Sequence, residues 1–463
     1  MLNWIWMGMI VVGVVVAALM GQLSGPNGIV EGLFKAVKSG VVDIVLPLSA
    51  VMMFWLGMMR LAEKSGLVLV LARIVRPLMR RLFPEVPADH PAMGAMVMNL
   101  AANMLGLGNA ATPLGLKAMQ HLDELNSSKG TATNSMCTFL AMNTSSVTLI
   151  PATAIGLLAA RGIPNPTAIV STTILASLFA TLVAIVSVKI FEKLPVFNRV
   201  SVDDAPAEGK ESAATSEIPE QRRLSPRAVA LLAVVGLLFV GVVCLETFPE
   251  RRAAIQNWMG LSDAVAHLNA AKQSLSETAS ANADPGWKRF ISALSIVAIP
   301  FLLVFFLVYA ALRRIRVYEE FVEGAKEGWA VAVRIMPFIV AMLAALAILR
   351  NSGAMYLFQE MLRPALAVVH FPPELVPMAL MRPLSGSGSQ GVLVEILMND
   401  GLTDLIKYTA ATMFGSTETT FYVLAVYFGS VAVRRTRHAL LAGLCADAAG
   451  LIGAVVICRF LVG

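Results

Sequence analysis

The chain has 463 residues, of which 57% are apolar and only 14% are charged. Soluble globular domains are typically about 45–50% apolar and about 25% charged, so this composition excludes an ordinary soluble protein. The net charge of +6 does not indicate nucleic-acid binding, because the Lys and Arg residues lie in short loops beside apolar stretches, where such charges set membrane topology. We therefore expect a polytopic protein whose main partner is the lipid bilayer and which binds no nucleic acid.

Long apolar stretches begin at Trp4, Ala228 and Phe290. Stretches of about 17–25 apolar residues are long enough to cross a bilayer as helices. The first stretch lies where a secretory signal would lie, but no Lys or Arg precedes Lys35, and a signal peptide needs a positively charged start. We expect this first segment to be retained as a helix.

The residue types that carry catalysis or bind metals form no useful pattern. The four cysteines lie in apolar stretches without metal-ligand spacing, and the five histidines lie near loops and form no ligand cluster. No nucleophile with an adjacent base and no phosphate-binding P-loop is visible. We expect no enzyme activity, no cofactor, no metal site and no ATP-driven pump.

Five pairs of similar segments occur in the same order in the two halves of the chain, which indicates an internal repeat. The paired segments contain Val30 and Val322, Pro47 and Pro337, Gly66 and Gly353, Gly106 and Gly386, and Met142 and Phe414. One such pair could arise by chance, but five in the same order indicate that one fold is written twice.

A polar insert separates the two copies. Residues 202–227 are rich in Pro, Ser and Glu, which is typical of a disordered linker. An apolar helix follows from Ala228, and a second polar stretch runs over residues 246–288. We expect a first repeat over residues 1–192, a second over 289–463, and between them, over 193–288, a cytoplasmic linker, a transmembrane helix and an external loop.

The distribution of positive charge predicts that the repeats are inverted. Six Lys and Arg residues lie between Gly57 and Arg81, whereas the equivalent segment of the second copy carries only Arg350 and Arg363. Because positive charge prefers the cytoplasm, the equivalent segments face opposite sides of the membrane. We therefore expect an all-α polytopic membrane protein with two inverted-topology repeats, an arrangement found in many secondary transporters.

The stretch Gly386–Gly391 spells G-x-G-x-x-G, the letters of a dinucleotide-binding loop. That fingerprint needs a preceding strand and a following helix, whereas short apolar segments flank this stretch and its partner at Gly106. Such short arms predict re-entrant hairpins whose glycine-containing tips turn near the middle of the bilayer. Helix N-termini at the tips offer N–H groups to a polar ligand, although close packing of small residues also explains the glycines.

Polar residues concentrate at both tips, including Asn99 on the first arm, and in one later apolar segment of each copy. Hydroxyl-rich interruptions of apolar segments predict broken helices that face a cavity, although such hydroxyls can also bond to their own helix. The candidate binding residues are Asn103, Asn109, Thr112, Ser385, Ser387, Ser389 and Gln390 at the tips, and Asn143, Thr144, Ser145, Ser146, Ser416, Thr417, Glu418 and Thr419 in the breaks.

Glu418 is the strongest single candidate, because an ionisable group inside a membrane segment is costly and points to function. The first copy has Ser146 at the matching position, so the charge breaks the symmetry. Burial disfavours a negative charge, so Glu418 either carries a proton or stays ionised and holds sodium or a substrate amine. Arg382, just before the second tip, pairs with Glu418 or with substrate. Asp447 is explained equally well by a packing hydrogen bond and by a functional role.

The same motifs resemble a known family. The segment "MNLAANMLGLGNAATPLGLKAM" resembles spore maturation protein A, and "RPLSGSGSQG", "GSTETTFYVLAVYFG" and "GLCADAAGLIGAVVICR" resemble spore maturation protein B. The chain is similar to a fusion of the two everywhere except residues 202–288. These proteins form the nucleoside-recognition, or Gate-domain, group, which is distantly similar to concentrative nucleoside transporters and ferrous-iron transporter gates. The resemblance implies a substrate site between two hairpin tips and two broken helices.

We therefore expect a secondary transporter of a small polar solute or cell-envelope metabolite, a class that includes nucleoside-like molecules, in the bacterial inner membrane. Coupling to H⁺ or Na⁺ and a homodimeric assembly are further expectations from related architectures. A membrane scaffold or assembly factor for envelope maturation is the first alternative, and lipid movement between leaflets is the second.

Overall fold

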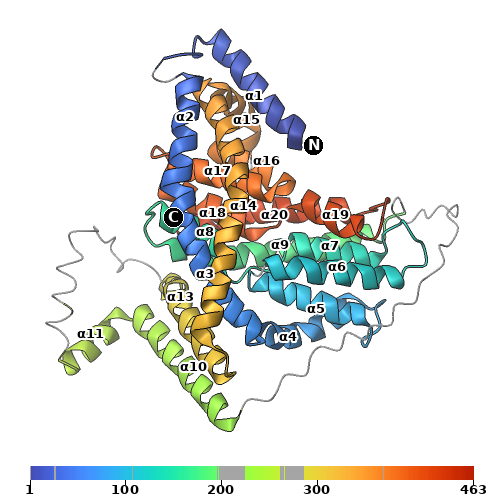
Figure 1. The fold of residues 1–463 in the computed structure, drawn as a ribbon, viewed down its shortest axis with the longest axis vertical. Helices are drawn as coiled ribbons and strands as arrows, with labels where there is room; N and C mark the ends of the chain where they lie inside the picture. Colours follow the sequence, from blue (N-terminus) through green and yellow to red (C-terminus); the bar gives the residue numbers. More distant parts are fainter. Residues whose placement is uncertain are drawn as a thin grey trace. The chain divides into compact units, whose positions relative to one another are not determined.

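The computed structural model describes residues 2–25, 28–106, 108–195, 197, 225–260, 265, 286–368 and 370–462. Most of the expected linker and of the expected external loop lies outside the described residues. The described part of the chain is helical, with a single isolated β-bridge between Thr131 and Arg435 (Figure 1). The predicted all-α fold is confirmed.

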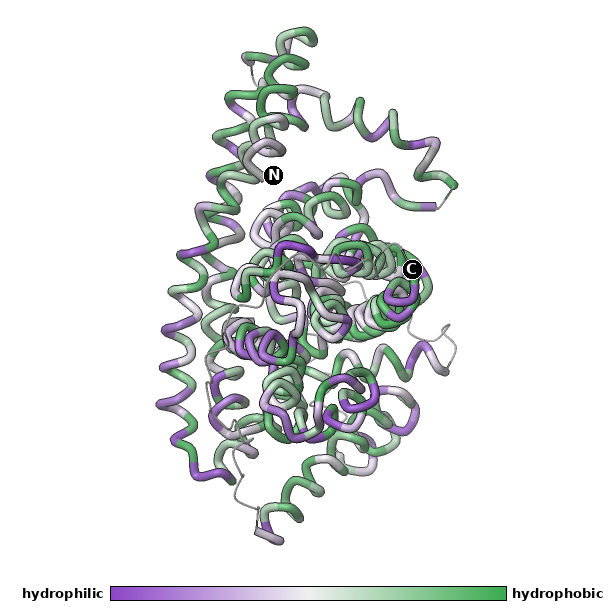
Figure 2. The backbone as a smooth tube through the Cα atoms, turned by 90° about the vertical axis from the view of Figure 1, so that its right-hand side faces the viewer, coloured by the Kyte–Doolittle hydropathy of each residue, from purple (hydrophilic) through white to green (hydrophobic). Residues whose placement is uncertain are grey.

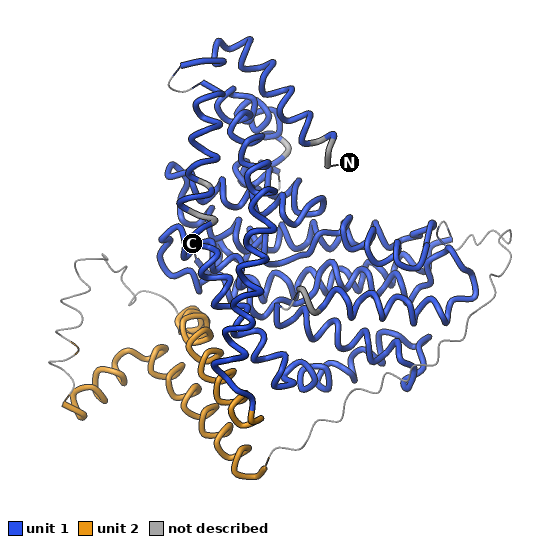
Figure 3. Tube along the Cα trace, in the orientation of Figure 1, with its two compact units in different colours: residues 1–222, 315–463 blue, residues 223–314 orange. Residues whose placement is uncertain are grey.

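The chain forms two compact units, residues 1–222 with 315–463, and residues 223–314 (Figure 3). The smaller unit contains α10 (Pro226–Thr247), α11 (Pro249–Trp258) and α13 (Gly286–Leu312). Its core forms where Val243 of α10 packs with Ala293 and Val297 of α13. The helix that we assigned to the start of the second repeat therefore clusters with α10, and the expected repeat boundary at residue 289 stays a prediction.

Six helices in the described ranges are long and apolar enough to cross a membrane, which establishes a multi-pass membrane protein. They are Ile29–Lys64, Pro166–Phe191, Pro226–Thr247, Gly286–Leu312, Val317–Asn351 and Ala439–Leu461. Helix α1 (Leu2–Leu19) adds a shorter apolar segment. Figure 2 shows stretches of hydrophobic residues along the helices, interrupted by hydrophilic residues.

The larger unit contains the same series of elements twice: a long helix, an amphipathic helix, a hairpin, a broken helix and a final long helix. In the first series, the long helix consists of α2 (Ile29–Ser39), the π-helical η1 (Gly40–Val45) and α3 (Leu46–Lys64), and the amphipathic helix is α4 (Leu67–Leu82). The hairpin is α5 (Pro91–Met104) and α6 (Gly108–Glu124), and the broken helix is α7 (Asn134–Thr144) and α8 (Ala152–Ala160). The final long helix is α9 (Ile169–Phe191), preceded by η2 (Pro166–Ala168). In the second series, the long helix is α14 (Val317–Asn351) and the amphipathic helix is α15 (Ala354–Val368). The hairpin is α16 (Val376–Leu384) and α17 (Gly386–Met398), preceded by η3 (Pro373–Leu375). The broken helix is α18 (Asp404–Ser416) and α19 (Thr420–Gly429), and the final long helix is α20 (Ala439–Leu461).

The first pair of equivalent helices packs antiparallel, as inverted copies require. Gly32 near the start of α2 lies against Asn351 at the end of α14, whereas Met53 in α3 lies against Gly328 nearer the start of α14. The chain therefore runs in opposite directions through α2–α3 and through α14, which stand side by side in Figure 1.

The last pair of equivalent helices crosses at matching positions. Helices α9 and α20 have 23 residues each, and a Cβ on Gly450, the twelfth residue of α20, would lie 3.4 Å from Ala180, the twelfth residue of α9. Gly453 lies against Phe179, so these helices also run antiparallel. Two equivalent pairs packed in this way confirm the inverted repeat.

In each hairpin, the helix that precedes the tip is too short to cross the membrane. The nine residues of α16 rise about 14 Å and the fourteen of α5 about 21 Å, against a hydrocarbon thickness of about 30 Å. The chain must therefore turn back inside the bilayer, which confirms the predicted re-entrant hairpins.

Glycines allow α3 and α14 to touch through their backbones. A Cβ on Gly328 would lie 2.6 Å from the Cα of Met53, and one on Gly324 would lie 2.6 Å from the carbonyl oxygen of Leu56. One end of the contact is closed by Arg60, whose Nε donates to Glu320 over 2.8 Å and whose Nη1 bonds Glu327. The seam between the repeats is thus a close backbone contact with an ionic lock.

We predict that Gly328→Ala destabilises the protein by about 1–3 kcal/mol, because the new methyl group must push the α3 backbone away. The melting temperature of the purified protein in detergent measures this. Gly236→Ala is the matched control, since nothing lies within 4 Å of a Cβ there and alanine favours the helix. Equal melting temperatures for Gly328→Ala and wild type would contradict the close seam.

A second buried cluster joins the start of α20 to the loops around it. Arg437 donates from Nη1 to the carbonyl of Ala132 and to Asn134, and from Nε to the carbonyl of Phe197. His438 is fully buried next to this arginine, with its ring edge-on to Phe197. Burial, helped by the positive charges of Arg437 and Lys189, lowers the pKa of His438 to about 4.

The lowered pKa of His438 makes the folded protein less stable as the pH falls. In the unfolded chain the histidine pKa is about 6.5, so the unfolded state binds more protons between pH 6.5 and about 4. We predict that the contribution of His438 to stability is constant above about pH 7 and is lost as the pH falls through this window. Between pH 7 and pH 5 the melting temperature of His438→Leu should change less with pH than that of wild type. The control His370→Gln, at an exposed position, should show the same dependence on pH as wild type. Parallel curves for wild type and His438→Leu would refute the shift.

Candidate functional site

A cavity of about 290 Å³ lies where the two hairpin tips, the two breaks and the α3–α14 pair meet. Residues from all of these elements line it: Met52, Asn103, Gly106, Thr148, Ile150, Pro151, Ala152, Thr153, Ala154, Val331, Ile335, Arg382, Gly386, Gln390, Phe414, Gly415 and Glu418. We call this space the central cavity.

The first tip depends on one left-handed glycine. Gly106 follows α5 with φ of +77°, a conformation that side chains rarely adopt, and a Cβ there would lie 2.9 Å from the carbonyl oxygen of Ile150. The backbone N–H of Leu149 donates to the carbonyl of Met104 over 2.9 Å. The tip is therefore held against the first break, and Asn103 on its last turn reaches the cavity wall.

The second tip is held by a helix cap. Ser385 lies between the two arms, and its Oγ accepts from the N–H of Gly388 over 3.0 Å, which starts α17. Gly386 and Gln390 on the first turn and a half of α17 line the central cavity, and the Nε2 of buried Gln390 has no partner in the described structure. No strand precedes this G-x-G-x-x-G stretch, which is preceded by α16, so the rejection of a dinucleotide loop holds.

The two breaks touch each other. The backbone N–H of Glu418 in the second break donates over 2.7 Å to the carbonyl of Thr144, the last residue of α7. This bond joins a carbonyl group at the end of α7 to an N–H group of the second break, and the break of each helix leaves such groups without an intrahelical partner. This contact sets the side chain of Glu418 at the wall of the central cavity.

Arg382 is the most unusual residue of the cavity. It is only 4% exposed, its guanidinium lies 4.9 Å from the ring centre of Phe414, and its Nη2 is 3.9 Å from Oε2 of Glu418. Its Nε has no partner among the described residues. Glu418 is not buried as expected, because 56% of its side chain remains exposed toward the cavity. The expected pairing of Arg382 with Glu418 is present.

The predicted site residues divide into two groups. The cavity is lined by Asn103, Arg382, Gln390 and Glu418. The remaining candidates lie off its wall: Thr112, Asn143, Thr144, Ser145, Ser146, Ser385, Ser387, Ser389, Ser416, Thr417 and Thr419. The side chain of Asn109 lies outside the described part of the structure. Thr144 and Ser145 donate to carbonyls one turn earlier in α7, so their hydroxyls satisfy their own helix.

Asn143 serves the site indirectly. Its Oδ1 accepts from Nδ2 of Asn103 over 3.0 Å and from the hydroxyl of Tyr427 over 3.4 Å, and Tyr427 is also 3.4 Å from Nδ2 of Asn99. This buried network orients Asn103 at the cavity. Tyr427 was missed because it lies in an apolar run of α19 without a polar neighbour in the sequence. Met52, Val331 and Ile335 were also missed, since apolar residues of a long helix carry no signal of a cavity.

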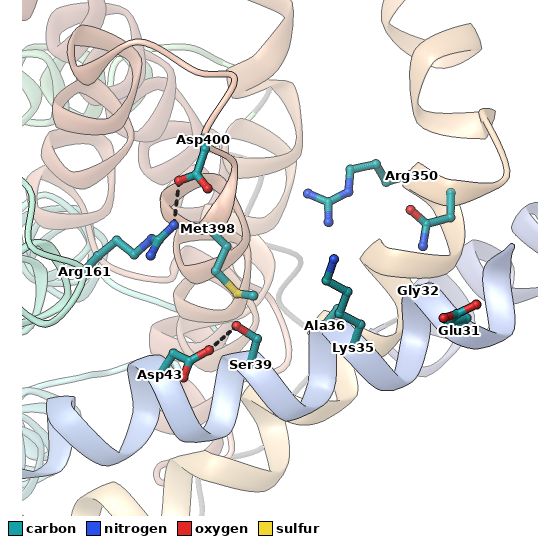
Figure 4. Close-up of a pocket in the computed structure, with 11 residues that line it drawn as sticks. Glu31, Gly32, Lys35, Ala36, Ser39, Asp43, Arg161, Arg350, Met398 and Asp400 are labelled. Atoms are coloured by element: carbon teal, nitrogen blue, oxygen red, sulfur yellow. Dashed lines mark hydrogen bonds and ion pairs between the residues drawn. The ribbon is translucent and has the colours of Figure 1, made fainter. Parts of the chain in front are cut away.

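A second, more polar pocket of about 360 Å³ lies at the far ends of helices that reach the central cavity. It is lined by Glu31, Gly32, Lys35, Ala36, Ser39, Asp43, Arg161, Arg350, Asn351, Met398 and Asp400 (Figure 4). We call it the distal pocket. Lys35 and Arg350 extend into it from α2 and α14, and Arg161 forms an ion pair with Asp400 over 2.6 Å. Three positive and three negative side chains line the pocket.

The chain matches the family model described as nucleoside recognition, or Gate, over residues 45–194 and 332–434, which is more than half of its length. Spore maturation protein A of Bacillus subtilis (strain 168) is 47% identical over 186 residues, covering 40% of this chain and 93% of that protein. Spore maturation protein B of the same organism is 39% identical over 173 residues, covering 37% of this chain and 97% of that protein.

Among solved structures, the YdaH transporter of Alcanivorax borkumensis, described as having an unusual topology, aligns with 100% of this chain and 97% of that chain. The TM-score is 0.44 and the identity is 15%. The two family-matched ranges contain both hairpins and both broken helices, and the two bacterial relatives are each covered almost completely. The chain therefore belongs to the nucleoside-recognition, or Gate, family of membrane proteins, as a fusion of counterparts of spore maturation proteins A and B.

Proposed function

We propose that this protein is a secondary transporter of a small polar solute that binds in the central cavity. The observation that carries the proposal is the cavity itself, a space with charged and amide side chains among re-entrant and broken helices of a membrane protein. Irregular backbone at membrane depth is tolerated where it lines a water-filled cavity. A scaffold with a solid core would need neither the cavity nor its charges.

The chemistry of the cavity suits a ligand with both hydrogen-bond donors and acceptors. The unpaired Nε of Arg382 can donate to a carbonyl, carboxylate or phosphate oxygen, and Glu418 can accept from a hydroxyl or an amine. The amide of Gln390 adds a free donor. A volume of about 290 Å³ lies at the lower limit for ligand pockets, so the solute is small, and a nucleoside-like molecule fits this description.

The distal pocket provides a route of access. Helices α8 and α17 begin at the central cavity and end at the distal pocket, and α14 lines the central cavity at its middle and the distal pocket at its end. From Ala152 to Arg161, from Ile335 to Arg350 and from Gln390 to Met398 the helices rise roughly 12–22 Å. A solute entering at the distal pocket would pass along these three helices to reach Arg382.

Coupling to a proton or sodium gradient, a homodimeric assembly and a place in the bacterial inner membrane are further parts of the proposal. The relatives are bacterial, and multi-pass α-helical proteins belong to inner membranes, since outer-membrane proteins are β-barrels. The relatives are named for spore maturation, which also fits an assembly factor, and lipid movement is the remaining alternative. The charged central cavity favours a polar solute over both.

We predict that Glu418→Gln lowers uptake of radiolabelled uridine, the nucleoside probe, by about tenfold or more in proteoliposomes with an imposed pH or sodium gradient. Losing a charged hydrogen bond costs about 1.5–3 kcal/mol, which corresponds to a factor of ten or more. The fold should survive, because the side chain is half exposed and the amide has a similar shape.

The matched control is Glu323→Gln, on α14 outside the cavity lining. It should leave uptake unchanged. Full uptake by Glu418→Gln would remove Glu418 from the site. If wild type takes up neither uridine nor a panel of amino acids, sugars and nucleobases under any gradient, the transporter proposal fails and the scaffold becomes the better reading.

Arg382 offers a test that separates function from stability. Removing one partner of a buried ion pair is costly when the other charge stays buried, but Glu418, which forms the one ion pair of Arg382 among the described residues, is 56% exposed. The change to Met therefore removes the cost of burying the guanidinium and leaves Glu418 in contact with the cavity. We predict that Arg382→Met melts at or above the wild-type temperature in detergent and yet loses uridine uptake. The comparison is Arg60→Met, which breaks the lock to Glu320 and Glu327 and should melt lower. A large drop in the melting temperature of Arg382→Met would mean that this arginine is structural.

A further inference from the structure

Asp447 is a buried carboxylate that the central cavity does not use. It lies in the middle of α20, is 1% exposed and is not part of the cavity lining. Its Oδ2 accepts from the hydroxyl of Thr420 over 2.5 Å, whereas Oδ1 has no hydrogen-bond partner among the described residues. An ionised carboxylate with a bare oxygen at this depth is costly, so the group calls for a compensating positive charge.

The inverted repeat identifies what stands at this position in the other copy. Asp447 is the ninth residue of α20, and the ninth residue of α9 is Ser177. Ser177 accepts from the N–H of Thr148 in the first break, just as Asp447 accepts from Thr420 at the end of the second break. Both copies thus bond the final helix to the break, and a neutral hydroxyl does this in the first. Packing therefore does not require a carboxylate at residue 447.

The face of α20 that carries Asp447 is pressed against the second break. A Cβ on Gly443 would lie 2.9 Å from Thr420, and one on Gly450 would lie 2.4 Å from Thr417. Asp447 lies between these glycines on the same helix face. The helix face that carries Asp447 is thus closely packed, which leaves little room for a cation larger than a proton.

The charged groups that act on Asp447 are Arg382 on α16 and Glu418 in the second break. The other elements packed on α20 present no charge nearby, since α7 and α19 carry no Lys, Arg, Asp or Glu, and the charges of α9 and α18 lie near the ends away from the breaks. Arg382 already faces Glu418 at 3.9 Å. One arginine therefore acts on two carboxylates, and one negative charge is left over.

We propose that Asp447 is a proton-binding site, occupied in this conformation, and that its proton is the coupling ion of transport. A proton is the one cation that needs no room, which suits a carboxyl group away from the cavity wall. The proton sits on Oδ1, the oxygen without a hydrogen-bond partner among the described residues. It comes from water on one side of the membrane and returns to water on the other. The coupling role rests on the proposed transport function, whereas the protonation itself does not.

Release of the proton would link the site to the substrate. An ionised Asp447 competes with Glu418 for Arg382, whose Nε is unpaired in the present arrangement. Because Arg382 lies on the arm of the second hairpin, a change of its partner moves or holds the tip that carries Gly386 and Gln390. Proton binding at α20 and solute binding in the central cavity are thereby connected through one arginine.

The protonation is tested by infrared difference spectroscopy of the reconstituted protein during a pH titration. At neutral pH, where ordinary carboxylates are ionised, wild type should show the C=O band of a protonated buried carboxyl group. Asp447→Asn and Asp447→Ser should lose this band, the serine variant reproducing the chemistry of Ser177. Glu323→Gln, at an exposed carboxylate of α14, should retain it. Glu418→Gln should weaken it, because Arg382 is then left with Asp447 as its partner. The proposal is overturned if wild type lacks the band at neutral pH or if both Asp447 variants keep it.

The coupling is tested separately by uridine accumulation in proteoliposomes. One-proton symport accumulates solute up to about tenfold per pH unit of gradient, since both correspond to about 1.4 kcal/mol. Asp447→Ser should equilibrate uridine without accumulating it, with Ser177→Ala as the matched control that keeps accumulation. Accumulation by Asp447→Ser, or wild-type transport indifferent to the pH gradient, would overturn the coupling role and leave transport standing. Absence of any wild-type uptake would refute transport, while the infrared result would still decide the proton site.

Discussion

Backbone groups inside a bilayer cannot turn to water, and this constraint organises the centre of the protein. The second tip is capped by its own Ser385, whereas the first tip and the two breaks find partners in one another. Leu149 bonds the carbonyl of Met104, so the first break supports the first tip, and Glu418 bonds the carbonyl of Thr144, so the two breaks support each other. The first tip and the two breaks are therefore held in one place, and the second tip lines the same cavity. The central cavity is the space that remains where they meet, and its polar lining follows from the residues that such turns require.

The scaffold is symmetric, whereas its chemistry is not. Equivalent helices meet at Ala180 and Gly450, and the first-repeat residue Ser177 makes the same kind of bond as Asp447. The ionisable residues of the site nevertheless come from the second repeat. Arg382 and Glu418 line the cavity, while the first repeat contributes Asn103 and the neutral residues around it. The first copy thus provides the orienting network and the second provides the charges.

The sequence predicted the fold well because its strongest signals are those of the bilayer. Apolar length, positive charge and repeated motifs decide which segments span and in which direction, and residues such as Gly106 mark turns that only glycine makes easily. The site was predicted only in part. The hydroxyls of Thr144 and Ser145 read as cavity residues, yet they bond to their own helix. Met52 and Tyr427 carry no local signal, because long-range packing alone brings them to the site.

The crossing of α9 and α20 at their equivalent midpoints has a geometric consequence. Two copies related by an axis in the membrane plane can exchange their conformations. After the exchange, the molecule has the same shape but faces the opposite side of the membrane. In this structure the second hairpin packs against the seam, since a Cβ on Gly391 of α17 would lie 2.7 Å from Met342 of α14. Under the proposed transport function, the reverse assignment would bring the first hairpin to the seam and open the opposite face without any new kind of contact. The close backbone contact of α3 and α14 through Gly324 and Gly328 would be the fixed part of the molecule in such an exchange. Two repeat conformations, exchanged between the two copies, would then be enough to open the cavity to either face of the membrane.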